Sequence, residues 1–359
     1  MVYYVRFLKP PKTEKSSRSS LSVSALICVT TDLGDSFLPD DVELRVTLTN
    51  HNSNVPLLGK SISWQAGSRQ LWVSLGPFDR NICNNQPVVL GIGAVDSGQC
   101  QRDQMSHEST VPLVISGWST PFGGPKDLQT ERLVERRFHL QGKHNLSIWE
   151  ETGNSIARHI WDAALASIIY LQRAIEGQAG RMPSLEQRLR KTRSPLRVVE
   201  LGSGCGIVGI ALAELLPECS VMLTDLAEVN DIVTRNMAVA QLAPKSALAF
   251  QTLDWDEQPP DELRNAGIDF ILVSDCTYNA DSLPSLVHVL DALVQTSPEA
   301  LVLVALKRRH DSEAIFFDLM QGAGFATLDH DKIALPSFGF GEDGHVDNIE
   351  LHCYGRNHE

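Results

Sequence analysis

The chain has 359 residues, of which 43% are hydrophobic and 21% charged, and it contains 25 glycines and 18 prolines. This globular composition excludes a chain that is disordered throughout, and the length fits one domain of about 200 residues and a second of about 140. The formal net charge is −13 and no long run of lysine or arginine occurs, so we expect no nucleic-acid partner.

The seven cysteines are scattered and show no paired CxxC spacing. An odd, dispersed set indicates a reducing compartment and no structural zinc, so we expect no bound metal. The N-terminus lacks the basic and apolar segments of a secretory signal, and no apolar stretch reaches about 18 residues. The sequence therefore predicts a cytoplasmic or nuclear protein without a membrane partner.

Residues 1–140 predict a small β-rich domain. Short runs of β-type residues at 21–30, 42–48, 71–75 and 88–92 are separated by Gly, Pro, Asn and Asp. No motif in this half carries recognisable chemistry. We expect an accessory domain of unknown role.

The pattern changes near residue 140, where the second predicted domain (141–359) begins. Apolar residues recur at helical spacing over 156–175, which predicts a long amphipathic helix with Ser155 as its N-cap. A polar stretch follows at 177–194. Predicted strands then lie at 197–201, 221–224, 247–253, 269–273 and 300–306, and predicted helices after Gly206, up to about 242, at 283–294 and at 312–322.

Such alternation of strands and helices predicts a parallel sheet. The last two predicted strands, 325–333 and 348–354, are separated only by a glycine-rich loop at 336–345. With no helix between them, they should form an antiparallel hairpin.

Residues 198–209 read VVELGSGCGIVG, a buried strand followed by a glycine-rich turn and the start of a helix. Gly202, Gly204 and Gly206 permit a tight turn and close approach of a ligand at the carboxyl end of the strand. A G-x-G-x-x-G match that begins at Gly204 leaves a dinucleotide site open. However, Glu200 and the three glycines resemble the E-x-G-x-G-x-G loop of class I methyltransferases.

Carboxylates and an aromatic residue follow the next two strands. Asp225, after the second strand, is placed to accept hydrogen bonds from ribose hydroxyls, although it could also cap the helix that follows. Asp254 and Trp255, after the third strand, lie where an adenine amino group and ring would need an acceptor and an aromatic wall. An ordinary loop with a core tryptophan is the alternative.

The fourth strand ends in VSDCTYN, which puts Asp275 and Tyr278 at the same sheet edge, beside the expected reacting group. The motifs E-x-G-x-G-x-G, D-W and D-x-x-Y, in this order, resemble the methyltransferase-like protein-lysine methyltransferases of the seven-strand class. The resemblance covers residues 140–354. That family includes enzymes that modify translation elongation factors and chaperones.

The resemblance implies a Rossmann-like seven-stranded sheet with an antiparallel last strand and S-adenosylmethionine as cofactor. It implies cofactor-binding roles for Trp161 (in a W-x-A-A segment), Glu200, Gly202, Gly204, Gly206, Asp225, Asp254, Trp255 and Asp275. Asp275 and Tyr278 are the implied catalytic residues, with Asp275 positioning the acceptor amine. The implied partner is a protein with an accessible lysine, of which an elongation factor is one example, and we expect a monomer.

Two further similarities are looser. Lys307-Arg308-Arg309 after the fifth strand resembles a basic segment of the family, and Glu151-Thr152-Gly153 resembles part of a cofactor lid. For both, a solvated loop is the simpler interpretation.

Three other functions stay open at this point. A small-molecule N-methyltransferase would share the cofactor site, although the extra β-rich domain and the absence of an N-P-P-Y/F motif favour a protein lysine. A catalytically silent cofactor-binding module is disfavoured by the intact motifs. A nicotinamide-dependent dehydrogenase would need an acid-base partner that the motifs do not provide.

Overall fold

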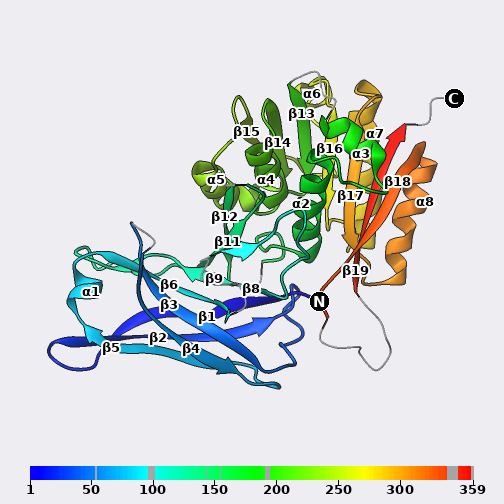
Figure 1. The fold of residues 1–359 in the computed structure, drawn as a ribbon. Coiled ribbons are helices and arrows are strands. Elements are labelled where there is room, and N and C mark those ends of the chain that lie inside the picture. Colours follow the sequence, from blue (N-terminus) through cyan, green and yellow to red (C-terminus); the bar gives the residue numbers. More distant parts are fainter. Residues whose placement is uncertain are drawn as a thin grey trace.

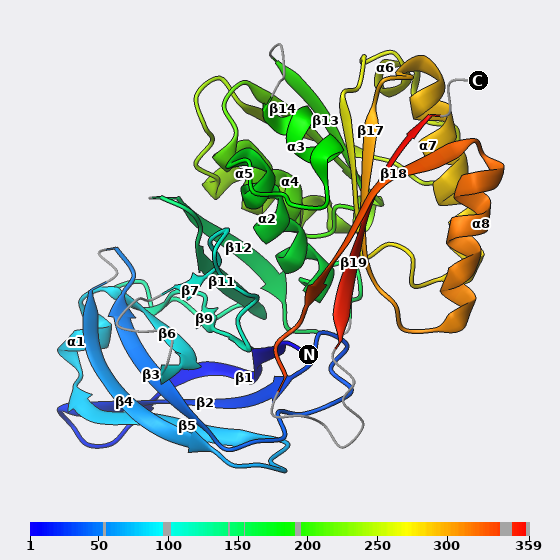
Figure 2. The ribbon, with the colours of Figure 1, turned by 45° about the vertical axis from the view of Figure 1, so that its right-hand side comes forward.

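The structure is a computed structural model that describes residues 1–52, 55–95, 102–142, 144–153, 155–190, 195–337 and 347–356. An all-β part formed by the first strands lies beside an α/β part formed by the rest (Figure 1). The N-terminus lies where the two parts meet, near the ends of β18 and β19 in both views (Figure 2).

Two sheets pack on each other in the all-β part. The first has the order β5 (Leu71–Asp79), β2 (Ser20–Thr30), β1 (Tyr3–Lys15) and β8 (Val114–Ile115). The second has the order β12 (Asn145–Glu151), β11 (Leu133–His139), β9 (Gly117–Ser119), β6 (Pro87–Ala94), β3 (Val42–Asn50) and β4 (Pro56–Trp64). Short strands β10 (Phe122–Gly123) and β7 (Asp103–Gln104) pair with β6 and β11, and α1 (Asn81–Asn84) precedes β6.

The four predicted β runs of this half are thus confirmed as β2, β3, β5 and β6. Their alternate apolar side chains, such as Ile27, Val46 and Leu90, form one core between the two sheets. This is the expected outcome of period-2 patterning when one face of each sheet is buried.

The α/β part contains a seven-stranded sheet with the order β15 (Ala247–Thr252), β14 (Cys219–Asp225), β13 (Leu196–Leu201), β16 (Phe270–Ser274), β17 (Leu301–Lys307), β19 (Asn348–Arg356) and β18 (Phe325–Ala334). The first five are parallel, whereas β19 runs antiparallel to both β17 and β18. The predicted sheet and its antiparallel last strand are confirmed. Of the loop predicted at 336–345, residues 338–345 lie outside the described residues.

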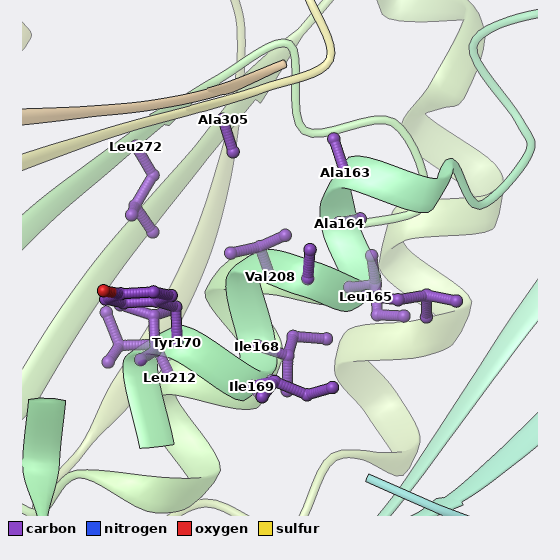
Figure 3. Packing of buried hydrophobic residues seen from close by; sticks show 14 of the residues in the cluster. Ala163, Ala164, Leu165, Ile168, Ile169, Tyr170, Val208, Leu212, Leu272 and Ala305 are labelled. Atoms are coloured by element: carbon purple, nitrogen blue, oxygen red, sulfur yellow. The ribbon is translucent and has the colours of Figure 1, made fainter. Parts of the chain in front are cut away.

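Helices cover both faces of this sheet. α2 (Asp162–Ile175), α3 (Pro183–Arg190), α4 (Ile207–Leu215) and α5 (Asn230–Val239) share a core with one face, and α6 (Asp261–Arg264), α7 (Leu283–Thr296) and α8 (Ile315–Gly322) with the other. Figure 3 shows Ile168 and Tyr170 of α2 near Val208 and Leu212 of α4, below Leu272 of β16. Successive strand residues contribute to the two cores in turn: Val198 packs in the first core and Val199 in the second.

The helix predicted from Ser155 begins seven residues later, so the N-cap prediction is wrong. Trp161 is extended (φ −105°, ψ 153°) and stands directly before the first helical residue, Asp162. The preceding segment is held out of the helix because Glu150 Oε2 accepts the amide of Ile160 (2.8 Å) and the carbonyl of Arg158 accepts the amide of Glu151 (3.1 Å). The apolar residues that suggested an earlier start include Ile156, which is 54% exposed.

The two parts are joined by backbone pairing and by a shared core. β12 lies beyond residue 140 in sequence, yet it pairs with β11 over its whole length. On its other side, the Asn236 side chain of α5 bonds both the amide (2.8 Å) and the carbonyl (2.9 Å) of Trp149. The core that contains α2 also contains Val2 and Tyr4 of the all-β part. The domain boundary near residue 140 therefore stays a prediction. In the structure, strand pairing, hydrogen bonds and a shared core connect the residues on its two sides.

Within the described residues, no helix is long and apolar enough to cross a membrane. The six cysteines of that part of the chain are free and buried.

Candidate active site

A cavity of about 700 Å³ opens at the carboxyl ends of β13, β14 and β16, against the segment that precedes α2. The predicted site residues that line it are Trp161, Glu200, Gly202, Gly204, Asp225, Asp254, Trp255, Asp275 and Tyr278. Gly206 is set back from the cavity, at the left-handed residue that precedes α4. The structure therefore brings together residues from five separate stretches of the chain.

The glycine loop leaves no room for side chains at two positions. Gly202 is left-handed (φ +65°), and a Cβ there would lie 2.5 Å from Cys276 Sγ. At Gly204 (φ +53°) a Cβ would lie 2.8 Å from the backbone oxygen of Ala157. The loop thus packs directly on the segment before α2, and both form walls of the cavity.

Asp225 ties the second strand to this loop. Its carboxylate accepts the amides of Gly204 and Leu226, each at 2.7 Å. Burial raises the pKa of Asp225, although these two amide bonds act in the opposite direction. Helix α5 begins only at Asn230, so Asp225 is not its N-cap. Asp225 also lines the cavity.

Glu200 is the most deeply buried acid of the site, with 2% of its surface exposed. Its Oε2 accepts the amide of Gly209 in α4 (2.8 Å). Burial raises the pKa of Glu200 from 4.5 to about 8, so the side chain carries its proton at neutral pH. A protonated Glu200 can donate a hydrogen bond as well as accept one.

This protonation predicts a pH-dependent effect of Glu200→Gln on stability. Between pH 4.5 and 8 the unfolded chain releases the Glu200 proton and the folded chain keeps it, so wild-type stability from this group falls as pH rises through that window. Glutamine keeps the bond to Gly209 without this loss. Relative to wild type, the variant should gain on the order of 4 kcal/mol by pH 8 and almost nothing at pH 4, because one pKa unit is about 1.4 kcal/mol. Urea unfolding midpoints across pH 4–9 test this, and a pH-independent difference would contradict it.

The third strand supplies Asp254, which is exposed, and Trp255, which is half-buried against the core on the second face of the sheet. Two hydroxyls on the cavity wall, Ser203 Oγ and Ser274 Oγ, are buried without a protein partner among the described residues. Buried polar atoms of this kind are normally satisfied, so they indicate that a polar ligand belongs here. Sequence motifs gave no signal for these two serines.

The part of the cavity wall that follows β16 contains Asp275 and Tyr278. Asp275 follows β16 in a left-handed conformation (φ +56°), which non-glycine residues adopt rarely and which is often found at functional sites. Asp275 is 5% exposed, whereas Tyr278 is 50% exposed at the rim. Ile156 and Leu226, also exposed, complete the apolar part of the rim.

Arg309 is bound to Asp275 by both of its terminal nitrogens. Nη1 donates to Oδ1 (2.8 Å) and Nη2 to Oδ2 (2.7 Å). The guanidinium also lies over the ring of Trp161, at 5.4 Å from its centroid. Burial would lower the pKa of Arg309, but the bonds and charge of Asp275 raise it above its ordinary value.

The interpretation of the basic segment as a solvated loop is therefore wrong for two of its three residues. Lys307 bonds Asp162 (2.9 Å) and Arg309 bonds Asp275, with 12% and 11% of their side chains exposed. Only Arg308 is well exposed, at 45%. The segment Glu151-Thr152-Gly153, which resembles part of a cofactor lid, does not line the cavity. Its Glu151 forms an ion pair with Arg158 (2.9 Å).

One group of described residues outside the cavity has the chemistry of a metal site: His330, Glu350 and His352, whose ligand atoms lie within 4.8 Å of one another. Glu350 is already bound by Arg308 (3.0 Å) and Lys332 (2.9 Å). The positive charges of these two side chains would repel a metal ion at Glu350. That the protein binds no metal remains a prediction.

A family model described as lysine methyltransferase matches residues 140–323. A UPF0665 family protein of Schizosaccharomyces pombe is 27% identical over 89% of this chain and 93% of its own. Protein N-lysine methyltransferase METTL21A of Danio rerio is 28% identical over 47% of this chain and 67% of its own. EEF1A lysine methyltransferase 3 of Xenopus tropicalis is 28% identical over 46% and 65%. The first of these matches extends well beyond the segment that the family model covers.

Proposed function

The chain belongs to the lysine methyltransferase family, and from this we infer that it transfers a methyl group from S-adenosylmethionine to a lysine side chain of a protein. The observation that carries the proposal is the single cavity in which the glycine loop, Asp225 and Asp275 meet. It combines a ligand-sized space with two acidic side chains in its lining.

The residues of the cavity fit S-adenosylmethionine. In our proposal Asp225 accepts the ribose hydroxyls, Asp254 the adenine amino group, and Trp255 packs on the adenine ring. The unpartnered hydroxyls of Ser203 and Ser274 and the protonated Glu200 add polar groups along the same wall. Trp161 and the glycine backbone complete the enclosure. When bound, the cofactor supplies a methyl group on a positively charged sulfur.

The acceptor amine must be neutral when it reacts. A free lysine has a pKa of about 10.4, so only about one in a thousand is neutral at pH 7. A lone carboxylate beside it would stabilise the charged form further. Because Arg309 neutralises Asp275, the pair can orient the amine by a hydrogen bond without that penalty. Tyr278 at the rim contacts the incoming side chain, and water takes the proton.

A protein substrate agrees with the rim of the cavity. Ile156, Leu226 and Tyr278 expose 54%, 44% and 50% of their surface around its mouth. A macromolecular partner would cover these apolar groups, and a small amine would leave them in water. The relative named for EEF1A makes a translation elongation factor the first candidate substrate. We place the reaction in the cytoplasm, with the protein acting as a monomer.

The test uses the purified full chain with labelled S-adenosylmethionine and a lysate of methyl-depleted cells. Mass spectrometry of any labelled band should find a methylated lysine, and purified elongation factor 1A is tested separately. A panel of small amines is the parallel arm. Labelling of a small amine but of no protein would overturn the proposed substrate class, and cofactor binding without any methyl transfer would overturn the proposed activity.

A further inference from the structure

Five charged side chains meet where the all-β part joins the α/β part, next to the cavity. This junction cluster consists of Asp32, Asp162, Asp275, Lys307 and Arg309. The three carboxylates are 3%, 0% and 5% exposed. Charges buried to this extent are costly unless each is paired, so the geometry of the cluster is tightly constrained.

Arg309 is the shared member between the all-β part and the acceptor site. Its Nη2 donates to Asp275 Oδ2 (2.7 Å) and to Asp32 Oδ2 (3.1 Å). One nitrogen thus bridges a carboxylate of the cavity and a carboxylate 243 positions earlier in the sequence. Lys307 stands beside them, 3.9 Å from Asp32 Oδ1 and 2.9 Å from Asp162 Oδ2.

Asp32 is held firmly by the all-β part. It follows β2, and its carbonyl accepts Arg6 Nη2 of β1 (2.8 Å). Its own Oδ1 accepts the amide of Leu33 (2.9 Å), which leaves Oδ2 directed at Arg309. The loop is closed by a bridge between Thr30 and Phe37. Contacts within the all-β part therefore hold the backbone and one carboxylate oxygen of Asp32, while its other oxygen is bonded by Arg309.

We propose that Asp32 is a positioning residue of the acceptor site, acting through Arg309 on the carboxylate of Asp275. The guanidinium is planar and can satisfy both carboxylates only in one orientation, which fixes Asp275 in the cavity. The all-β part thereby completes the catalytic centre. This inference rests on the proposed function, because Asp275 matters only if an amine is positioned there.

A purely structural ion pair would stabilise the junction without affecting Asp275. A double-mutant cycle of Asp32→Asn and Asp275→Asn distinguishes this structural role from the proposed positioning role. The quantity measured is the shift of the urea midpoint in each variant. If Arg309 links the two carboxylates, the midpoint shift of the double variant should differ from the sum of the two single shifts. If the two sites are independent, the single shifts should add. Additive shifts would overturn the proposal. This measurement does not depend on methyl transfer, so its result can be interpreted even if the protein proves not to methylate lysine.

The second measurement is kinetic. Asp32→Asn should lower kcat about tenfold, since a displacement of ~1 Å at a reacting group can cost ~10²-fold, and should leave the KM for S-adenosylmethionine unchanged. Asp103→Asn is the matched control, because Asp103 is also buried in the all-β part (1% exposed) but bonds Ser116. An Asp32→Asn enzyme with wild-type kcat, or an equal loss in Asp103→Asn, would overturn the positioning role.

Discussion

Replacing Asp275 by alanine should lower methyl transfer by about 10²-fold or more and change the affinity for S-adenosylmethionine by less than about threefold. The loss follows from removing the group that orients the amine, since positioning supplies much of the rate in a reaction of this kind. Cofactor affinity is retained because Asp225, the glycine loop and Trp255 are untouched.

The structure adds a second expectation for this variant. Arg309 would lose two of its bonds and keep that to Asp32, at 3.1 Å. A buried cation that loses part of its pairing destabilises the fold, so the urea midpoint should fall as well. Single-turnover rates and calorimetric cofactor binding, on protein shown to be folded, separate the two effects. Asp231→Ala removes a 73% exposed carboxylate and serves as control. Wild-type turnover in Asp275→Ala would refute the assignment.

Gly204→Ala should weaken cofactor binding by roughly tenfold to a hundredfold. The left-handed backbone at Gly204 (φ +53°) costs a residue with a Cβ about 1–2 kcal/mol, and the new Cβ would meet the carbonyl oxygen of Ala157 at 2.8 Å. The loop must move to relieve this contact. Moving it breaks the bond from the Gly204 amide to Asp225 (2.7 Å) and displaces two walls of the cavity together.

Gly67→Ala is a matched control for the backbone strain alone. Gly67 is also left-handed (φ +78°), but a Cβ there would have nothing within 4 Å. Both variants should lose some stability, and only Gly204→Ala should lose affinity in calorimetric titration with S-adenosylmethionine. Equal affinities in the two variants would show that the close approach at Gly204 does not shape the site.

Sequence reasoning predicted which residues line the cavity where the signal is local in the chain. Gly202 and Gly204 are readable because a tight turn after a buried strand needs their conformation, and Asp225 and Asp275 because parallel strands end at one edge. The strands were found for a similar reason: their apolar residues alternate between the cores on the two faces of the sheet. Each of these signals lies within a few residues of chain.

It failed where the deciding partner is distant in sequence. The start of α2 depends on Glu150 of β12, which captures the amide of Ile160, and apolar periodicity carries no trace of that bond. Helix α3 lies in a stretch taken as polar, since only Leu185 and Leu189 of its eight residues are buried. Arg309 looked solvated because neither of its carboxylate partners, Asp275 and Asp32, is local in sequence. Lone charged residues in loops gain meaning only from the fold.

The core shared by the two parts makes the stability of the α/β part depend on the all-β part. Val2 and Tyr4 pack in the same apolar cluster as the helix that supports the cavity. Strand β12 pairs with β11 on one side and is bonded by the Asn236 side chain of α5 on the other. A gene segment that encoded the catalytic half alone would leave that cluster open to water and an edge strand without its neighbour. In this chain, we therefore expect the α/β part to lose stability when it is produced without the all-β part.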